Sequence, residues 1–362
     1  MAKQLSPKLI RITSEEIGVS DTSTIFRAFF NDIQNDIDKL FITLISNLKE
    51  KNKTIFRKQQ DKSSKRFIDS VSLIGGSAYR LFGKWVSEQL KDDKWLNETM
   101  APRTHDYDIW FYMNPNDINK PDTKKKMIQC MVGIMNMIEL KIIEKGKVDQ
   151  LIPFSDAIQI PDSESNEIIN YLKQWGTSRH KYLRIQLLDI NPILNTYHIQ
   201  LNINIDGHVD HIIEFICTYN ECDYNIHNYK LYGYEFSMPT IESFINKTFD
   251  AIKNRGDPSV IRTENNYKCK QDTARLIQFI NSIEECHKKN IKDIKDQISL
   301  EHIKYFKQKL FKLITEEFIY CDVINPEHWN TWIKTEGTHR KSTRKCRKST
   351  RKCRKSMRKC RK

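Results

Sequence analysis

The stretch from residue 71 to residue 112 constrains the fold more than any other part of the chain. A short apolar run at 71–74 predicts a buried strand, which leads through Gly75, Gly76 and Ser77 into a helical pattern. Glycines in front of a helix let the backbone approach a ligand closely, and the N-terminus of a helix favours an anion. This stretch therefore predicts a strand–turn–helix unit that binds phosphate.

A second strand, expected within 103–112, carries Asp106 and Asp108 at its start. Residues i and i+2 of a strand point to the same side, so the two carboxylates can share a pair of divalent cations. The apolar run after Asp108 indicates a buried strand, where acids are costly unless a cation neutralises them. A phosphate site beside a two-carboxylate metal site suits nucleotidyl transfer, in which two metals stabilise the attacking and leaving oxygens.

The two motifs together resemble those of the nucleotidyltransferase superfamily of the DNA polymerase beta type. That superfamily carries Gly-Gly/Ser after a first strand and Asp-x-Asp on a second. The long gap between Ser77 and Asp106 looks more like the catalytic subunit of the poly(A) polymerases of poxviruses and other large cytoplasmic DNA viruses. Their signature also has Gly-Gly-Ser/Thr-Ala followed by an aromatic residue, as at 75–79. The resemblance covers about residues 65–285.

The resemblance implies a template-independent polynucleotide adenylyltransferase, which adds AMP from ATP to RNA 3′ ends. It implies that Gly75, Gly76 and Ser77 bind the triphosphate, the last through its hydroxyl and backbone N–H. Asp106 and Asp108 would be catalytic and would ligate both metal ions, Mg²⁺ or Mn²⁺. The implied fold is α+β, a nucleotidyltransferase palm of mixed or antiparallel sheet with flanking helices, plus a C-terminal helical domain and a disordered basic tail.

A third acid in this superfamily lies on a strand next to the Asp-x-Asp strand. We expect it in the strand at 208–218, where Glu214 lies among apolar residues and needs a partner. Glu214 is therefore predicted to be catalytic and metal-binding, with Asp210 or Asp206 as the alternative. Glu departs from the Asp of the superfamily pattern. If Glu214 instead pairs with a basic side chain inside the sheet, the site has only two acids.

Residues 265–276 resemble the helix that follows the palm in the viral poly(A) polymerases. Lys268, Lys270 and Arg275 are candidates for binding the triphosphate or RNA phosphates, and Tyr267 for stacking on a base. A solvent-exposed helical face of mixed charge explains these residues equally well.

The net charge of +14 comes entirely from the C-terminal tail at 340–362, which holds 14 Lys or Arg residues and no acid. Its seven-residue repeat lacks an apolar face, which predicts disorder and excludes a coiled coil. Such a tail attracts RNA or DNA through counterion release. A repeat expansion without a dedicated role explains it equally well.

Composition and the N-terminal sequence argue against a membrane or secreted protein. No apolar run reaches membrane-spanning length, and the N-terminus lacks the apolar core of a signal peptide. Nine cysteines without a Cys-x-x-Cys pair predict reduced thiols and no zinc site. We therefore expect a cytoplasmic protein, located in the host cytoplasm or the virion if it is viral.

The hydrophobic pattern and the resemblance together divide the chain into four expected regions. These are an N-terminal helical region at 1–60, the nucleotidyltransferase catalytic domain that the resemblance implies at 61–235, a helical domain at 236–335 and the basic tail at 336–362. The expected elements are helices at 21–50 and 124–145, an irregular region at 147–180, strands at 182–190, 197–205 and 208–218, and helices from 241 to about 318. Asp206 and Gly207 predict a two-residue hairpin turn.

Two other function classes fit the same motifs. One is a nucleotidyltransferase with a different acceptor, such as a transfer RNA end, a protein or a small molecule. The other is a catalytically degenerate polymerase fold that binds RNA beside an active partner. The sequence leaves nucleotide preference, acceptor and oligomeric state open, and only the family suggests a homodimer or a viral helper subunit.

Overall fold

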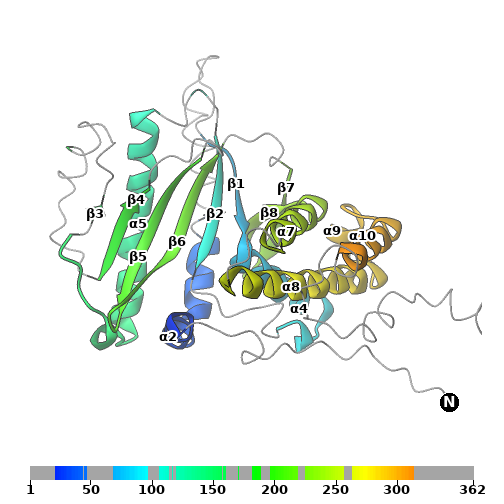
Figure 1. The fold of residues 1–362 in the computed structure, drawn as a ribbon, viewed down its shortest axis with the longest axis horizontal. Helices are drawn as coiled ribbons and strands as arrows, with labels where there is room; N and C mark the ends of the chain where they lie inside the picture. Colours follow the sequence, from blue (N-terminus) through cyan, green and yellow to red (C-terminus); the bar gives the residue numbers. More distant parts are fainter. Residues whose placement is uncertain are drawn as a thin grey trace, which may run out of the picture.

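A mixed sheet with flanking helices forms this α+β protein, as the sequence predicts (Figure 1). The computed structural model describes residues 21–43, 45–46, 68–96, 106–113, 116, 120–156, 158–159, 170, 182–188, 196–218, 225–256 and 263–313. The predicted disordered tail and most of the predicted irregular region lie outside the described residues.

The main sheet has six strands in the order β1-β2-β6-β5-β4-β3. Its strands are β1 (Ile68–Ile74), β2 (Tyr107–Met113), β3 (Ile158–Gln159), β4 (Leu183–Leu187), β5 (Tyr197–Ile205) and β6 (His208–Thr218). β2 runs parallel to β6, and β3 to β4, while the other pairs are antiparallel. The strand that carries the Asp-x-Asp motif is therefore the direct neighbour of the strand that carries Glu214.

The β5–β6 hairpin has the predicted bounds and the predicted turn. Asp206 and Gly207 both have positive φ, 51° and 89°, as a type I′ hairpin turn requires. The hairpin also contains a β-bulge, because Leu201 pairs with Ile213 while Asn202 pairs with His211. Ile212 is the extra residue of the bulge, and a bulge re-aims the side chains on either side of it.

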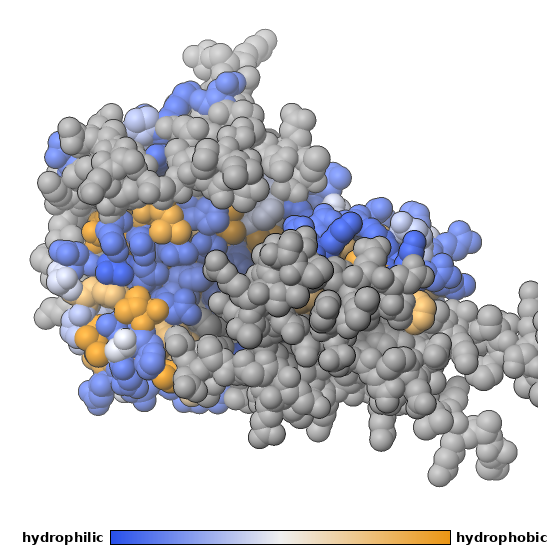
Figure 2. Space-filling view, viewed as in Figure 1, coloured by the Kyte–Doolittle hydropathy of each residue, from blue (hydrophilic) through white to orange (hydrophobic). Residues whose placement is uncertain are grey.

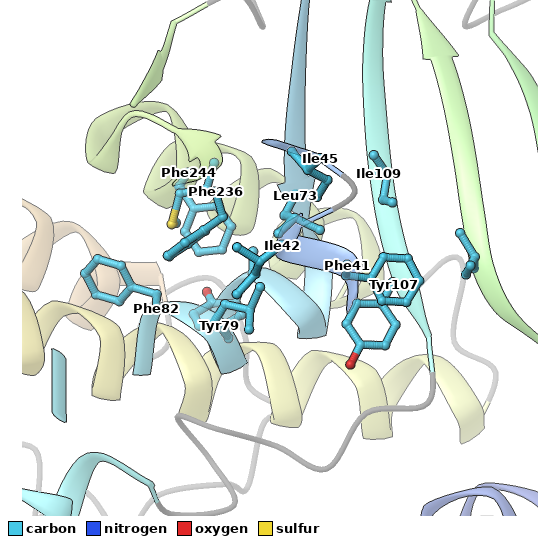
Figure 3. Close-up of a cluster of buried hydrophobic side chains, with 14 of the residues drawn as sticks. Phe41, Ile42, Ile45, Leu73, Tyr79, Phe82, Tyr107, Ile109, Phe236 and Phe244 are labelled. Atoms are coloured by element: carbon cyan, nitrogen blue, oxygen red, sulfur yellow. The ribbon is translucent and has the colours of Figure 1, made fainter. Parts of the chain in front are cut away.

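Helices cover the face of the sheet that Tyr107 occupies. α5 (Pro121–Glu144) packs along β4 and β5 (Figure 1). The side chains of its predicted methionine stripe are buried. It begins three residues before the predicted start because Pro121 suits the first turn of a helix. Phe41 stacks on the Tyr107 ring at 4.1 Å between centroids, within the cluster that Figure 3 shows.

The N-terminal helical segment differs from its prediction. A single helix at 21–50 is wrong, since α2 (Asp21–Phe30) ends at a turn over 31–33, after which residues 34–43 are helical again. Asn31 and Asp32 occupy this turn, and both residue types favour turns through their short polar side chains. Ile33, Ile37 and Phe41 are nevertheless buried, as their spacing predicts.

The remaining helices and a small hairpin form the other side of the molecule (Figure 1). They comprise α4 (Gly75–Leu90), η1 (Asp93–Leu96), β7 (Ile226–Leu231), β8 (Tyr234–Pro239), α7 (Ile241–Gly256), α8 (Thr263–Lys288), α9 (Lys292–Lys295) and α10 (Leu300–Lys312). The short helix η2 (Val148–Gln150) instead lies beside the end of β5, where Gln150 accepts a backbone hydrogen bond from Asp206. The helices after residue 241 were expected, whereas the β7–β8 hairpin was not, and β8 runs across the predicted boundary between residues 235 and 236. Tyr79 and Phe82 of α4 pack against Phe244 and Phe279, so aromatic side chains join α4 to α7 and α8.

Figure 2 shows the surface of the molecule in the same view as Figure 1. Among the described residues this surface is mostly hydrophilic, and its hydrophobic residues lie in small separate areas. Within the described part of the chain, no helix has both the length and the apolar character needed to cross a bilayer.

Candidate metal and phosphate site

The carboxylates of the Asp-x-Asp motif lie on the sheet face opposite Tyr107. Tyr107 and Ile109 are buried, while Asp108 between them is half-buried and points to the other face. Asp106 directly precedes β2 and is two residues before Asp108, so its side chain points to the same face of the sheet. In the parallel β2–β6 pair, Asp108 is the register partner of Glu214. Three acids therefore meet on one face at the start of β2.

The β-bulge adds His211 to this group. Ile213 pairs with Tyr107, and Ile212 lines the same small void as Tyr107 and Ile138, so two consecutive residues of β6 face the helices. His211 and Glu214 then both lie on the face of the acids. One carboxylate oxygen each of Asp106 and Asp108 and a ring nitrogen of His211 lie within 4.8 Å of one another, a spacing that suits ligands of one metal ion.

Negative charge is concentrated at this site. Burial raises the pKa of Asp108 well above its usual range, and the charges of Asp106 and Glu214 raise it further. Burial alone would lower the pKa of His211, but the hydrogen bond and charge of Asp210, with the charges of Asp106 and Glu214, raise it to about 9. A bound cation would relieve the repulsion among these carboxylates.

Glu214 is held by the neighbouring strand β5. Its Oε1 accepts hydrogen bonds from His198 Nδ1 at 3.0 Å and from Gln200 Nε2 at 2.8 Å. Burial would raise the pKa of Glu214, but these two hydrogen bonds and the charges of His198 and His211 lower it. The pairing with a basic side chain, which the sequence left open, is therefore present, and it occupies one of the two carboxylate oxygens.

The two alternatives for the third acid lie elsewhere on the hairpin. Asp210 is 3.1 Å from the ring Nδ1 of His211. Asp206 is exposed in the β5–β6 turn. Only Glu214 of these three acids is the register partner of Asp108.

Gly75 lies directly beside Asp108. Ile74 of β1 pairs with Asp108, and α4 begins at Gly75, the first of the three predicted phosphate-binding residues. A Cβ atom on Gly75 would lie 2.2 Å from Asp108 Oδ2, and its φ is +62°. Glycine is therefore required here both by the backbone conformation and by the contact with the acid.

Gly76 and Ser77 complete the first turn of α4. Gly76 is half-buried, and no side chain caps this end of the helix, because Ile74 is the N-cap. Ser77 is fully buried and its hydroxyl donates to the carbonyl oxygen of Ile74 at 2.9 Å. This hydroxyl proton is therefore used within the strand–helix junction, and the contact of Ser77 with phosphate stays a prediction. The first N–H groups of an α-helix have no carbonyl partner within the helix, so the start of α4 favours an anion.

The three predicted basic residues lie on α8. Lys268 is exposed on α8, the side chain of Lys270 lies outside the described residues, and Arg275 is 3.9 Å from Asp272. Asp272 also pairs with Arg255 of α7, whose charge acts to lower the pKa of Asp108. Arg275 is thus connected through Asp272 to Arg255, the residue whose charge acts on Asp108.

Two basic residues of α7, Arg255 and Lys247, were not predicted from the sequence. The Nζ atom of Lys247 lies 3.5 Å from the centroid of the Trp110 ring. Trp110 is two residues beyond Asp108 on β2, so Lys247 lies over the same face of the sheet. Nothing in the local sequence marks either residue, because only the tertiary structure brings Lys247 to Trp110 and Arg255 to Asp272.

No protein-family model matches the chain, and no curated protein or solved structure is detectably similar to it.

Proposed function

We propose that this chain is a nucleotidyltransferase that adds AMP from ATP to RNA 3′ ends without a template. The observation that carries the proposal is the contact between Gly75 and Asp108. It joins the first turn of α4, where phosphate would bind, to the strand that carries the acids. On this proposal the sheet is the palm of a polymerase-beta-type enzyme and α7 to α10 form its C-terminal helical domain.

Divalent cations fit the residues of the site. Carboxylate oxygens are the ligands that Mg²⁺ and Mn²⁺ prefer, and imidazole is a further ligand for the transition metals. Asp106 and Asp108 would hold both ions, with Glu214 or His211 as a further ligand. The raised pKa of Asp108 supports this, because burial and like charges disfavour its ionised form until a cation is near. Bound metal would neutralise phosphate charge and make the acceptor hydroxyl more acidic.

The residues of the chain itself would bind and orient the substrates. The backbone N–H groups at Gly75 and Gly76 would donate to the triphosphate at the start of α4. Arg255, anchored by Asp272, would add positive charge beside the phosphates. Lys268 on the exposed surface of α8 would attract phosphates of the triphosphate or the RNA.

A labelled RNA, each nucleoside triphosphate in turn, and Mg²⁺ or Mn²⁺ test the proposal. We expect the RNA 3′ end to be extended, with ATP as the best donor, and extension to disappear in the Asp106→Asn variant. A transfer RNA, a protein and a small hydroxyl compound tested in parallel would reveal a different acceptor. Absence of product with every nucleotide and every acceptor would refute the proposal.

A degenerate, RNA-binding polymerase fold is the second candidate. The specific observation in its favour is that His198 and Gln200 already occupy one oxygen of Glu214. Titration with Mn²⁺ in the presence of ATP separates the two candidates. The enzyme should bind Mn²⁺ saturably and lose this binding in the Asp106→Asn variant, whereas the scaffold should show no Asp106-dependent binding.

A further inference from the structure

We propose that Asp38 is a positioning residue. From the opposite face of the sheet, it fixes β2, which carries the acids, relative to α4, which carries the phosphate-binding turn. This inference rests on the proposed function. Asp38 is fully buried in the helical segment at 34–43. Its carboxylate accepts hydrogen bonds from the Tyr107 hydroxyl, from Lys84 Nζ, and from Arg80 Nε at 2.9 Å.

The three donors come from the two elements that carry the motifs. Tyr107 is the β2 residue between Asp106 and Asp108. Arg80 and Lys84 lie one turn apart on α4, the helix whose first residue is Gly75. One buried carboxylate thus connects the strand of the metal-binding acids to the helix of the phosphate-binding turn.

Further contacts hold the donors in place. Gln34 Nε2 donates to the Tyr107 hydroxyl at 2.7 Å, and Lys84 Nζ donates to Asn35 Oδ1 at 2.7 Å. Phe41 stacks on the Tyr107 ring with an angle of 15° between the ring planes (Figure 3). Gln34, Asn35 and Phe41 all lie in the segment at 34–43, and none of them belongs to the proposed site. The segment therefore holds β2 and α4 in place from the face of the sheet opposite the acids, and we call it the brace.

Stability alone is a weak explanation for this cluster. Replacing a buried ion cluster by apolar residues of similar volume is often neutral or stabilising, because desolvation offsets much of the attraction between charges. Burial indeed lowers the pKa of Lys84, although the charge of Asp38 acts to raise it. What such a cluster supplies is fixed geometry, since its hydrogen bonds form only at particular distances and angles.

The site needs that fixed geometry. The Gly75 backbone approaches Asp108 so closely that no Cβ fits between them. Catalytic groups displaced by about 1 Å can lose roughly 100-fold in rate. A change at Asp38 or at Tyr107 should therefore act on turnover without touching substrate or metal.

The test compares Tyr107→Phe and Asp38→Asn with Glu284→Gln as a matched control. Tyr107→Phe keeps the ring that stacks on Phe41 and removes only the hydroxyl. Glu284 forms a partly buried ion pair with Lys307 between α8 and α10, two elements that carry neither motif. The measurements are kcat and KM for ATP, the melting temperature, and hydrogen exchange of the backbone amides at 74–78.

We expect Tyr107→Phe to lower kcat about 10-fold or more while KM for ATP changes less than threefold. Exchange at 74–78 should become faster, although the hydroxyl that was removed lies on β2. Glu284→Gln should lower the melting temperature and leave kcat and exchange at 74–78 unchanged. Asp38→Asn should act in the same direction as Tyr107→Phe, and Tyr107→Phe alone suffices if Asp38→Asn does not fold.

Unchanged kcat in folded Tyr107→Phe protein, or an equal loss in Glu284→Gln, would overturn the positioning role. If the wild-type protein transfers no nucleotide, the proposed function fails. The hydrogen-exchange measurement then still tests whether Asp38 positions β2 and α4. Faster exchange at 74–78 in Tyr107→Phe, absent from Glu284→Gln, would support the brace. Unchanged exchange would refute it.

Discussion

Asp108 of β2 and Glu214 of β6 are direct register partners across a parallel pair of strands. Their side chains therefore share one face of the sheet, and the charge of Glu214 is one of the causes that raise the pKa of Asp108. Two acids placed so close together without a cation are unfavourable to the fold. This relationship leads to predictions on metal binding and on stability.

Asp108→Asn should abolish nucleotide transfer, because the amide keeps the volume of the side chain and removes the charge that metal ions need. In metal-free buffer its melting temperature should equal or exceed that of the wild type, since the repulsion from Asp106 and Glu214 is gone. Transfer assays and thermal melts in the presence of a chelator check both statements. Near-normal turnover in this variant would show that the metal assignment is wrong.

Gly75→Ala should abolish transfer, with Gly146→Ala as its matched control. Both glycines have positive φ, +62° and +66°, so each alanine adds backbone strain of roughly 1–2 kcal/mol. Only at Gly75 would the new Cβ meet Asp108 Oδ2, whereas nothing lies within 4 Å at Gly146. Transfer rates and melting temperatures of the two variants test this. Equal activity in both would mean that the close approach to Asp108 is not needed.

Glu214→Gln should lower transfer roughly 100-fold, because it removes a charge beside the metals while an amide oxygen can still accept from His198 and Gln200. His211→Gln should have a smaller effect on transfer. Mn²⁺ affinity of the two variants, measured in the presence of ATP, decides which residue is the third ligand. Greater loss of affinity in His211→Gln would transfer this role from Glu214 to His211.

Glu284→Gln should destabilise the protein in a pH-dependent manner. Burial would raise the pKa of Glu284, but the hydrogen bond and charge of Lys307 and the charge of Lys288 lower it. A lowered folded-state pKa contributes stability above the unfolded pKa, near 4.3, and this stability is lost as the pH falls through the folded value. We expect a deficit of about 1–3 kcal/mol at pH 7 that shrinks below about pH 4. Denaturant melts of both proteins from pH 3 to pH 7 provide the check, and a constant deficit would contradict the ion pair.

Deletion of residues 340–362 should weaken RNA binding and leave kcat at saturating RNA unchanged. The tail carries the whole net charge of +14, so its contacts should be diffuse and sensitive to salt. A salt series of RNA affinities should give a shallower slope for the truncated protein, with similar weakening for every RNA sequence. Equal slopes would show that the tail does not contact RNA.

The sequence by itself determined those features that depend on neighbouring residues. The β5–β6 hairpin has its predicted bounds because Asp206 and Gly207 favour the turn and the alternation on either side favours strands. The buried methionine face of α5 follows from helical spacing in the same way. Local signals were weaker elsewhere. They did not predict the β7–β8 hairpin or the turn at 31–33. They also did not predict that the Ser77 hydroxyl would donate a hydrogen bond to the carbonyl oxygen of Ile74.

The tertiary structure alone decided how these parts meet. The register of Asp108 with Glu214 depends on the order of strands in the sheet, and the approach of Lys247 to Trp110 depends on how α7 packs. The contact of Asp38 with Tyr107 likewise joins segments that are far apart in the chain. Such contacts depend on the simultaneous burial of many side chains. The motifs therefore predicted the candidate residues of the site, while long-range packing determined which other side chains lie beside them.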